Sequence, residues 1–221
     1  MLSPTFIPEL ESFSDRINLN KVVAIPNPAP FPSDRSALQA KEKRLLFVGR
    51  LANQQKRVDR VLLIWKRIAN DFPDWQLDIL GDGPDRRQLE NRSREMSLER
   101  IVFHGSQDPV PFYRRSQFLL LTSDFEGFGM VLVEAQAFGC IPIATNCFSA
   151  ISDVIDDGRT GFITPVDNMD LFTRTLSLAI SSPKKARIMG EAAVSHVAKF
   201  SSSRTAERWL SELKKVVGPT R

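Results

Sequence analysis

The chain has 221 residues, 42% of them hydrophobic, and a formal net charge of +4 at neutral pH. That length and apolar content suffice for one ample core, or for one domain plus part of a second. The small basic excess fits an anionic ligand or membrane head groups, whereas the lack of an RNA-binding motif or an aromatic–basic stripe argues against nucleic acid. No apolar stretch is long enough to span a membrane, and no secretory signal precedes Ile7.

The first 40 residues predict little regular structure. They contain six prolines, and residues 22–25 are the one short strand candidate. Because proline lacks a backbone donor and fixes its own backbone angle, such a segment is poorly suited to a sheet or a long helix. We therefore expect a mostly irregular segment ahead of the first domain.

Two cations follow the first strong strand pattern. Residues 45–49 predict a buried strand ending at Gly49, Arg50 comes next, and Lys56 precedes a segment with helical apolar spacing over residues 58–68. Ligands of open α/β sheets bind beyond the carboxyl ends of the strands. There, Arg50 can contact a diphosphate through its forked guanidinium, and Lys56 can act as a point charge. The alternative is a pair of solvated surface cations.

Two further short strands each end in glycine. Residues 76–80 lead into a glycine turn, after which Pro84 is suited to the first position of a helix. Residues 101–105 form the next predicted strand. His104, near its end, could line the same cleft or could be a lone histidine without a role in a site.

An acidic glycine loop follows the next strand, which is predicted over residues 118–121. Backbone N–H groups left free at the start of the following helix favour an anion such as phosphate. Because a carboxylate repels phosphate, Glu126 and Glu134 are better suited to accept hydrogen bonds from the hydroxyls of a sugar or ribose. The alternative is a solvated loop glutamate and a glutamate favoured by the start of a helix. Substrate binding is predicted for one residue of the loop after the first strand and for five residues after the strand at 118–121: Gly49, Gly127, Phe128, Gly129, Met130 and Glu134.

The C-terminal part predicts one more strand, over residues 141–145, and then three helices. The helices are expected over residues 169–181, 184–200 and 203–217. The apolar face of the last helix is sparse, so that helix could be exposed.

Other conspicuous side chains receive a structural interpretation. The two cysteines, Cys140 and Cys147, are expected to be free thiols in a reducing compartment. Tyr113, with the two arginines after it, is expected on a solvated helix face. No Asp-x-Asp or histidine ligand set is present, so no metal is predicted. The tryptophans are expected to be packing anchors: Trp65, Trp75 and Trp209.

The acidic pair with its internal Gly-Phe-Gly, Glu126-x7-Glu134, is similar to the signature of the retaining glycosyltransferases of the GT-B fold, family 4. Further segments resemble the family in the same order, over roughly residues 41–182. Two departures are visible. Arg57 stands where the family usually has glycine, and residues 146–153 lack a glycine pair that many relatives carry. The matching segments are Gly49-Arg50-Leu51 with Lys56, Gly81-Asp82-Gly83-Pro84, residues 101–105, residues 137–145 and residues 157–163.

The resemblance implies an α/β fold: a Rossmann-like parallel sheet of about six strands flanked by helices, forming one lobe of a GT-B enzyme. Residues 1–40 would be the end of an N-terminal lobe and the interlobe linker, residues 41–182 the nucleotide-sugar-binding domain, and residues 183–221 the C-terminal helices. A nucleoside diphosphate sugar would be the donor, with no metal or cofactor. The residues implied in catalysis are Arg50, Lys56 and Glu126.

The resemblance also implies an activity for the intact enzyme, which is transfer of a sugar with retention to a hydroxyl of a glycan or lipid-linked acceptor. The acceptor would be held by an N-terminal lobe, so we expect these 221 residues alone to be inactive. We expect a cytoplasmic location, at the inner face of the membrane, with peripheral membrane association as one option.

Two alternatives stay open at this point. A sugar phosphorylase or a nucleotide-sugar epimerase can use the same lobe architecture, and a non-catalytic nucleotide-binding module can keep the binding residues alone. A NAD-binding Rossmann domain is disfavoured, because the loop at Gly49 lacks the Gly-x-Gly-x-x-Gly pattern.

Overall fold

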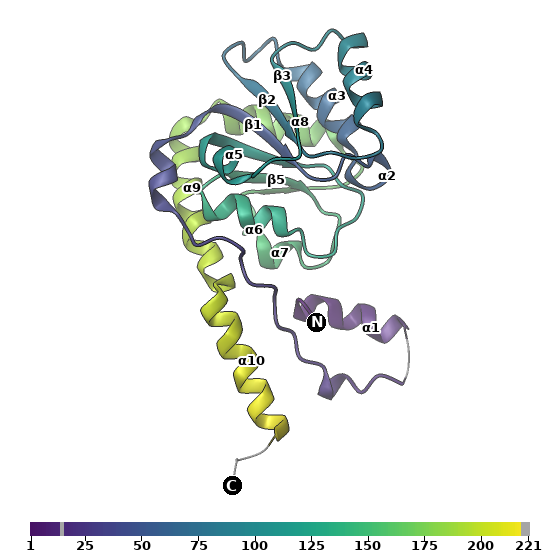
Figure 1. The fold of residues 1–221 in the computed structure, drawn as a ribbon, viewed down its shortest axis with the longest axis vertical. Coiled ribbons are helices and arrows are strands. Elements are labelled where there is room, and N and C mark those ends of the chain that lie inside the picture. The colour runs from purple at the N-terminus through teal and green to yellow at the C-terminus, as the bar shows by residue number, and fades with distance from the viewer. Residues whose placement is uncertain (14–15, 218–221) are drawn as a thin grey trace.

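The structure is a computed structural model that describes residues 1–13 and 16–217 (Figure 1). Its centre is a six-stranded sheet in which all paired strands are parallel, in the order β3-β2-β1-β4-β5-β6. The predicted Rossmann-like sheet is therefore confirmed. The strands are β1 (Glu42–Val48), β2 (Gln76–Leu80), β3 (Ile101–Gly105), β4 (Ser116–Leu121), β5 (Ile141–Thr145) and β6 (Phe162–Thr164).

Helices cover both faces of the sheet and create two apolar cores. One core lies between the sheet and α3, α8 and α9, and the other lies between the opposite face and α5, α6 and α7. Burial on both faces explains why β4 and β5 read as continuous apolar runs. The helices of the domain are α2 (Asn53–Lys56), α3 (Val58–Ile68), α4 (Arg86–Glu95), α5 (Val110–Arg115), α6 (Met130–Ala137), α7 (Ile151–Val154), α8 (Met169–Ile180) and α9 (Pro183–His196).

The strand order reverses direction between β1 and β4, which are neighbours although β2 and β3 separate them in sequence. Leu45 pairs with Phe118 and Leu46 with Leu119 across this junction. The loops that follow β1 and β4 therefore emerge side by side. In doubly wound folds such a junction opens the crevice in which ligands bind.

The N-terminal segment corrects one prediction, because residues 22–25 form no strand. Ile25 donates its backbone N–H to the Met1 carbonyl at 2.7 Å, but no ladder develops. Four prolines follow within seven residues and remove the donors that a ladder would need. Within residues 1–13 and 16–40 the regular structure is limited to short helical pieces: η1 (Pro4–Phe6), α1 (Ile7–Phe13), η2 (Leu19–Lys21) and η3 (Arg35–Gln39).

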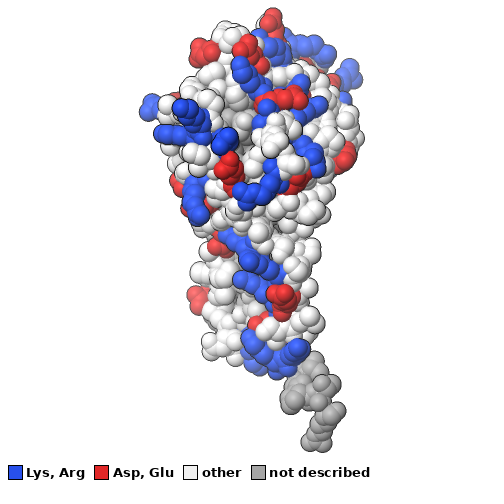
Figure 2. All heavy atoms as spheres, turned by 90° about the vertical axis from the view of Figure 1, so that its left-hand side faces the viewer, with Lys and Arg blue, Asp and Glu red and all other residues white. Residues whose placement is uncertain are grey.

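Helix α10 (Ser202–Val217) follows the short turn η4 (Val197–Phe200) and projects away from the sheet (Figure 1). Its exposed apolar residues include Trp209, at 53% exposure, so the prediction that Trp209 is a packing anchor was wrong. Trp65 and Trp75 are buried as predicted. On the side seen in Figure 2, lysine and arginine side chains form a row that continues down this projection.

The start of α4 and the state of the two cysteines are smaller features of the domain. Helix α4 begins at Arg86 rather than at Pro84, which lies in the preceding turn. Both cysteines are free thiols, as expected. Over the described ranges, no helix combines the length and the apolarity required to cross a lipid bilayer.

Candidate functional site

The loop after β1 carries the first predicted cation into solvent. Arg50 is exposed, and within residues 1–13 and 16–217 its side chain makes no hydrogen bond or ion pair. The backbone beneath it is fixed, because Leu51 donates its N–H to the Asp82 carbonyl at 2.8 Å. Arg50 is thus a cation without a counterion among the described residues, on a backbone segment that a hydrogen bond holds in place.

Glycine is required where the loops after β1 and β2 meet. Gly81 has a φ of +134°, and a Cβ placed there would lie 1.9 Å from the carbonyl oxygen of Gly49. A side chain at this position would therefore displace the backbone that carries Arg50.

Lys56, the second predicted cation, is not a free point charge. Its ammonium contacts both carboxylate oxygens of Glu126, at 2.7 and 2.9 Å, and the two side chains are 19% and 9% exposed. Ser123 donates a further hydrogen bond to Oε1 of Glu126 at 2.6 Å. The structure therefore brings two predicted site residues together, and the interpretation of Lys56 as a solvated cation was wrong.

Arg57, which stands where the resembled family usually has glycine, lies in a left-handed turn. Its φ and ψ are +49° and +48°, the left-handed conformation that L-residues adopt at a cost. The guanidinium contacts both carboxylate oxygens of Asp59 at 3.1 Å and Asp124 at 3.0 Å. These contacts hold the turn against its strain, and the carboxylates beside it raise the pKa of Arg57.

The glycine loop after β4 presents backbone donors. Gly129 has a φ of +65° and precedes the first residue of α6, while Gly127 is exposed with no atom near its Cβ position. The amides of residues 127–130 donate no backbone hydrogen bond within the part of the chain that the structure describes. Together with the N-terminus of α6, these donors suit an anion.

Two side chains of this loop differ in their surroundings. The Phe128 ring is buried and meets the Phe200 ring edge-on, with centroids 5.8 Å apart. Phe128 therefore offers a ligand its backbone rather than its side chain. Met130, at the start of α6, is half-buried.

Glu134 in α6 has a partner that the sequence did not reveal. The Tyr113 hydroxyl donates to Oε2 of Glu134 at 2.8 Å, and Tyr113 is fully buried. The prediction of a solvated face at Tyr113 was therefore wrong. Burial, and then the nearby Glu134 carboxylate, raise the pKa of the Tyr113 hydroxyl, which stays a donor. The apolar run of residues 110–113 was the available signal for a buried helix face.

His104 belongs to a polar network on the sheet. Its Nε2 lies 2.7 Å from Oδ1 of the fully buried Asp78, which also pairs with Arg44 at 2.9 Å. This contact gives His104 a structural partner and favours the interpretation without a role in a site. Among the residues described, no group of three or more histidine, cysteine or acidic side chains could hold a metal ion.

A parallel sheet whose strand order reverses between β1 and β4, with cationic, acidic and glycine-rich loops at the reversal, defines a doubly wound α/β domain. Residues 31–196 match the family model described as glycosyl transferases group 1. The chain belongs to this family, and its sheet is the Rossmann-like lobe of a GT-B glycosyltransferase fold.

Several relatives of known name are also glycosyltransferases. The chain is 28% identical over 188 residues to an uncharacterized glycosyltransferase of Haemophilus influenzae, covering 81% of this chain and 53% of that protein. It is 35% identical over 147 residues to the lipopolysaccharide 1,6-galactosyltransferase of Salmonella typhimurium, covering 63% and 40%. The solved apo lipopolysaccharide outer core galactosyltransferase WaaB superposes with a TM-score of 0.75 at 25% identity, covering 97% and 60%. The chain thus spans about half the length of the curated relatives it matches.

Proposed function

We propose that this chain is the nucleotide-sugar-binding lobe of a retaining family 4 glycosyltransferase. The intact protein would transfer a sugar from a nucleoside diphosphate sugar to a hydroxyl of a glycan or lipid-linked acceptor. One observation carries the proposal. The unpaired Arg50 and the unpaired amides of residues 127–130 follow adjacent strands, with Glu126 and Glu134 beside them.

Each group has a proposed role that follows from its contacts. Arg50 and the amides of residues 127–130 stabilise the charge that develops on the departing diphosphate, the main electrostatic demand of such a transition state. Glu126, held by Lys56 and Ser123, accepts hydrogen bonds from hydroxyls of the transferred sugar. Lys56 shares its ammonium between Glu126 and the phosphate.

The ribose and the phosphates of the donor are assigned to separate groups of the protein. Glu134 accepts a hydrogen bond from a ribose hydroxyl through Oε1, the carboxylate oxygen that Tyr113 does not contact. The cation and the amides supply the countercharge to phosphate, so the proposal needs no metal or cofactor. We place acceptor binding outside these 221 residues, at a cytoplasmic membrane face, in line with the lipopolysaccharide acceptors that the names of the relatives imply.

Titration calorimetry with uridine and guanosine diphosphates, with and without a chelator, tests the proposal. We expect metal-free binding by the wild-type chain and about tenfold or greater weakening in Arg50→Ala, because a charge-assisted hydrogen bond is worth roughly 1.5–3 kcal/mol. Arg174→Ala is the matched control, since Arg174 is exposed on α8, which follows the edge strand β6, and among the described residues its side chain makes no hydrogen bond or ion pair. Loss of binding with chelator would exclude the metal-free site, and an unchanged Arg50→Ala affinity would exclude the phosphate role.

A further inference from the structure

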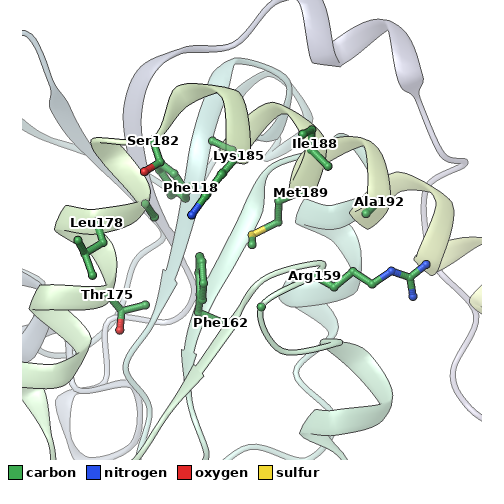
Figure 3. A pocket seen from close by; sticks show the side chains of 13 residues that line it. Phe118, Arg159, Phe162, Thr175, Leu178, Ser182, Lys185, Ile188, Met189 and Ala192 are labelled. Atoms are coloured by element: carbon green, nitrogen blue, oxygen red, sulfur yellow. The ribbon is translucent and has the colours of Figure 1, made fainter.

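A second cavity lies where α8 and α9 pass over the sheet (Figure 3). Its volume is about 660 Å³, within the range of small-molecule sites. Phe118, Phe162 and Met189 supply buried or half-buried apolar walls, and Leu178 and Ile188 stand at its rim, each 64% exposed.

This cavity is separate from the nucleotide crevice. It opens near the amino ends of the strands, because Phe162 is the first residue of β6 and Gly158 precedes that strand. The crevice residues Arg50 and Glu126 follow the carboxyl ends of β1 and β4. No crevice residue lines the cavity.

The charges around the cavity have one sign. None of its thirteen lining residues is acidic, and two are cationic. Arg159 pairs with Asp156 at 2.8 Å and points away from the cavity (Figure 3). Lys185 is exposed, but its side chain extends over Phe118 at the mouth of the cavity (Figure 3), and among the described residues its ammonium has no ion pair or hydrogen bond. An ammonium without a partner above apolar walls favours a ligand that is apolar in its body and anionic at one end.

We propose that this cavity binds a single alkyl chain that ends in an anionic group, of the fatty-acid class. The chain contacts Phe118, Phe162 and Met189, and the head group meets the Lys185 ammonium and the Ser182 hydroxyl. A nucleotide does not fit this chemistry, because the walls offer apolar carbon where a base and ribose need donors and acceptors.

Methionine methyl signals locate the ligand directly. The chain has five methionines, of which Met189 alone lines the cavity. Octanoate, decanoate and dodecanoate, each below its micelle concentration, are titrated into methyl-labelled protein. We expect a saturable shift of the Met189 signal, with Kd falling about tenfold for each added pair of methylenes. Decanol, which has no charge, binds more weakly than decanoate.

Matched variants separate the charge from the apolar contact. Lys185→Gln raises the decanoate Kd severalfold, and Lys184→Gln, its exposed neighbour outside the cavity, does not. Leu178→Gln weakens binding, and Leu171→Gln on the same helix does not; both leucines are exposed, so folding is preserved. Arg50→Ala leaves decanoate binding unchanged. An unshifted Met189 signal, equal affinity for decanol, or equal effects of the two lysine variants would overturn the proposal.

Discussion

The Tyr113 hydroxyl donates a 2.8 Å hydrogen bond to Oε2 of Glu134 and joins α5 to α6 beneath the crevice. Tyr113 cannot turn away, because it is fully buried and its ring stacks on Phe138 at 6.1 Å between centroids. One carboxylate oxygen of Glu134 is therefore fixed by the protein, and the other remains for a ligand.

Tyr113→Phe keeps the ring and removes this hydrogen bond, so Glu134 gains rotational freedom. We expect the affinity for uridine diphosphate to fall threefold to tenfold, and the free energy of unfolding to fall by about 1 kcal/mol. Calorimetry with uridine diphosphate and its 2′,3′-dideoxy form measures the effect. The dideoxy ligand should bind both proteins alike, and an equal loss for both ligands would argue against a role at the ribose.

Arg50→Ala and Lys56→Ala should differ in stability although both remove a cation. Arg50 is exposed and unpaired, so its loss should cost under ~1 kcal/mol. Lys56→Ala leaves Glu126 poorly solvated and without its cation, and should cost about 2 kcal/mol. Urea unfolding of both variants, and of Glu126→Gln with and without Lys56→Ala, measures this coupling. Additive effects in that cycle would show that the ion pair contributes nothing to stability.

Arg57→Gly should be more stable than Arg57→Ala by about 1 kcal/mol. Both variants lose the contacts with Asp59 and Asp124, but only glycine relaxes at a φ of +49°. Thermal unfolding of the two variants provides the measurement. If alanine proved as stable as glycine, the left-handed turn would have to be absent in solution.

Lys41 should make stability depend on pH in the alkaline range. Burial lowers the pKa of its ammonium to about 8, although Cys140 and Asp34 nearby favour the charged form. Lys41 also donates to the carbonyls of Tyr113 and Ser116, at 2.7 and 2.9 Å.

The direction of this pH dependence follows from which state, folded or unfolded, binds more protons at Lys41. Between about pH 8 and the usual lysine range near 10.4, the unfolded chain holds more protons on Lys41 than the folded chain. The unfolding free energy of the wild-type protein should therefore rise with pH relative to Lys41→Met, by up to about 3 kcal/mol. Urea titrations from pH 7 to 10.5 test this, and parallel curves for the two proteins would contradict it.

The sheet and the order of its site loops could be predicted because strands buried on both faces read as short apolar runs. Residues 45–49 and 118–121 show this pattern, and the structure places a strand at each. The false strand at residues 22–25 has the same composition, but it has no neighbouring strand to pair with.

The contacts inside the crevice could not be predicted in this way. Lys56 and Glu126 are 70 residues apart, and their ion pair exists because β1 and β4 are neighbours in the sheet. Local patterns do not encode that adjacency. Tyr113 was missed for a different reason, because the two arginines after it were given more weight than the apolar run of residues 110–113, which packs α5 against the sheet.

The neighbouring positions of β1 and β4 also have a kinetic consequence. Their pairing closes a chain segment that contains β2, β3 and the helices α2 to α5, so it is a non-local step with a large loop-closure entropy. Until it occurs, Arg50 and the amides of residues 127–130 are not in one place. In a refolding experiment, nucleotide binding should therefore appear after helical circular dichroism, as a reporter of completed sheet assembly.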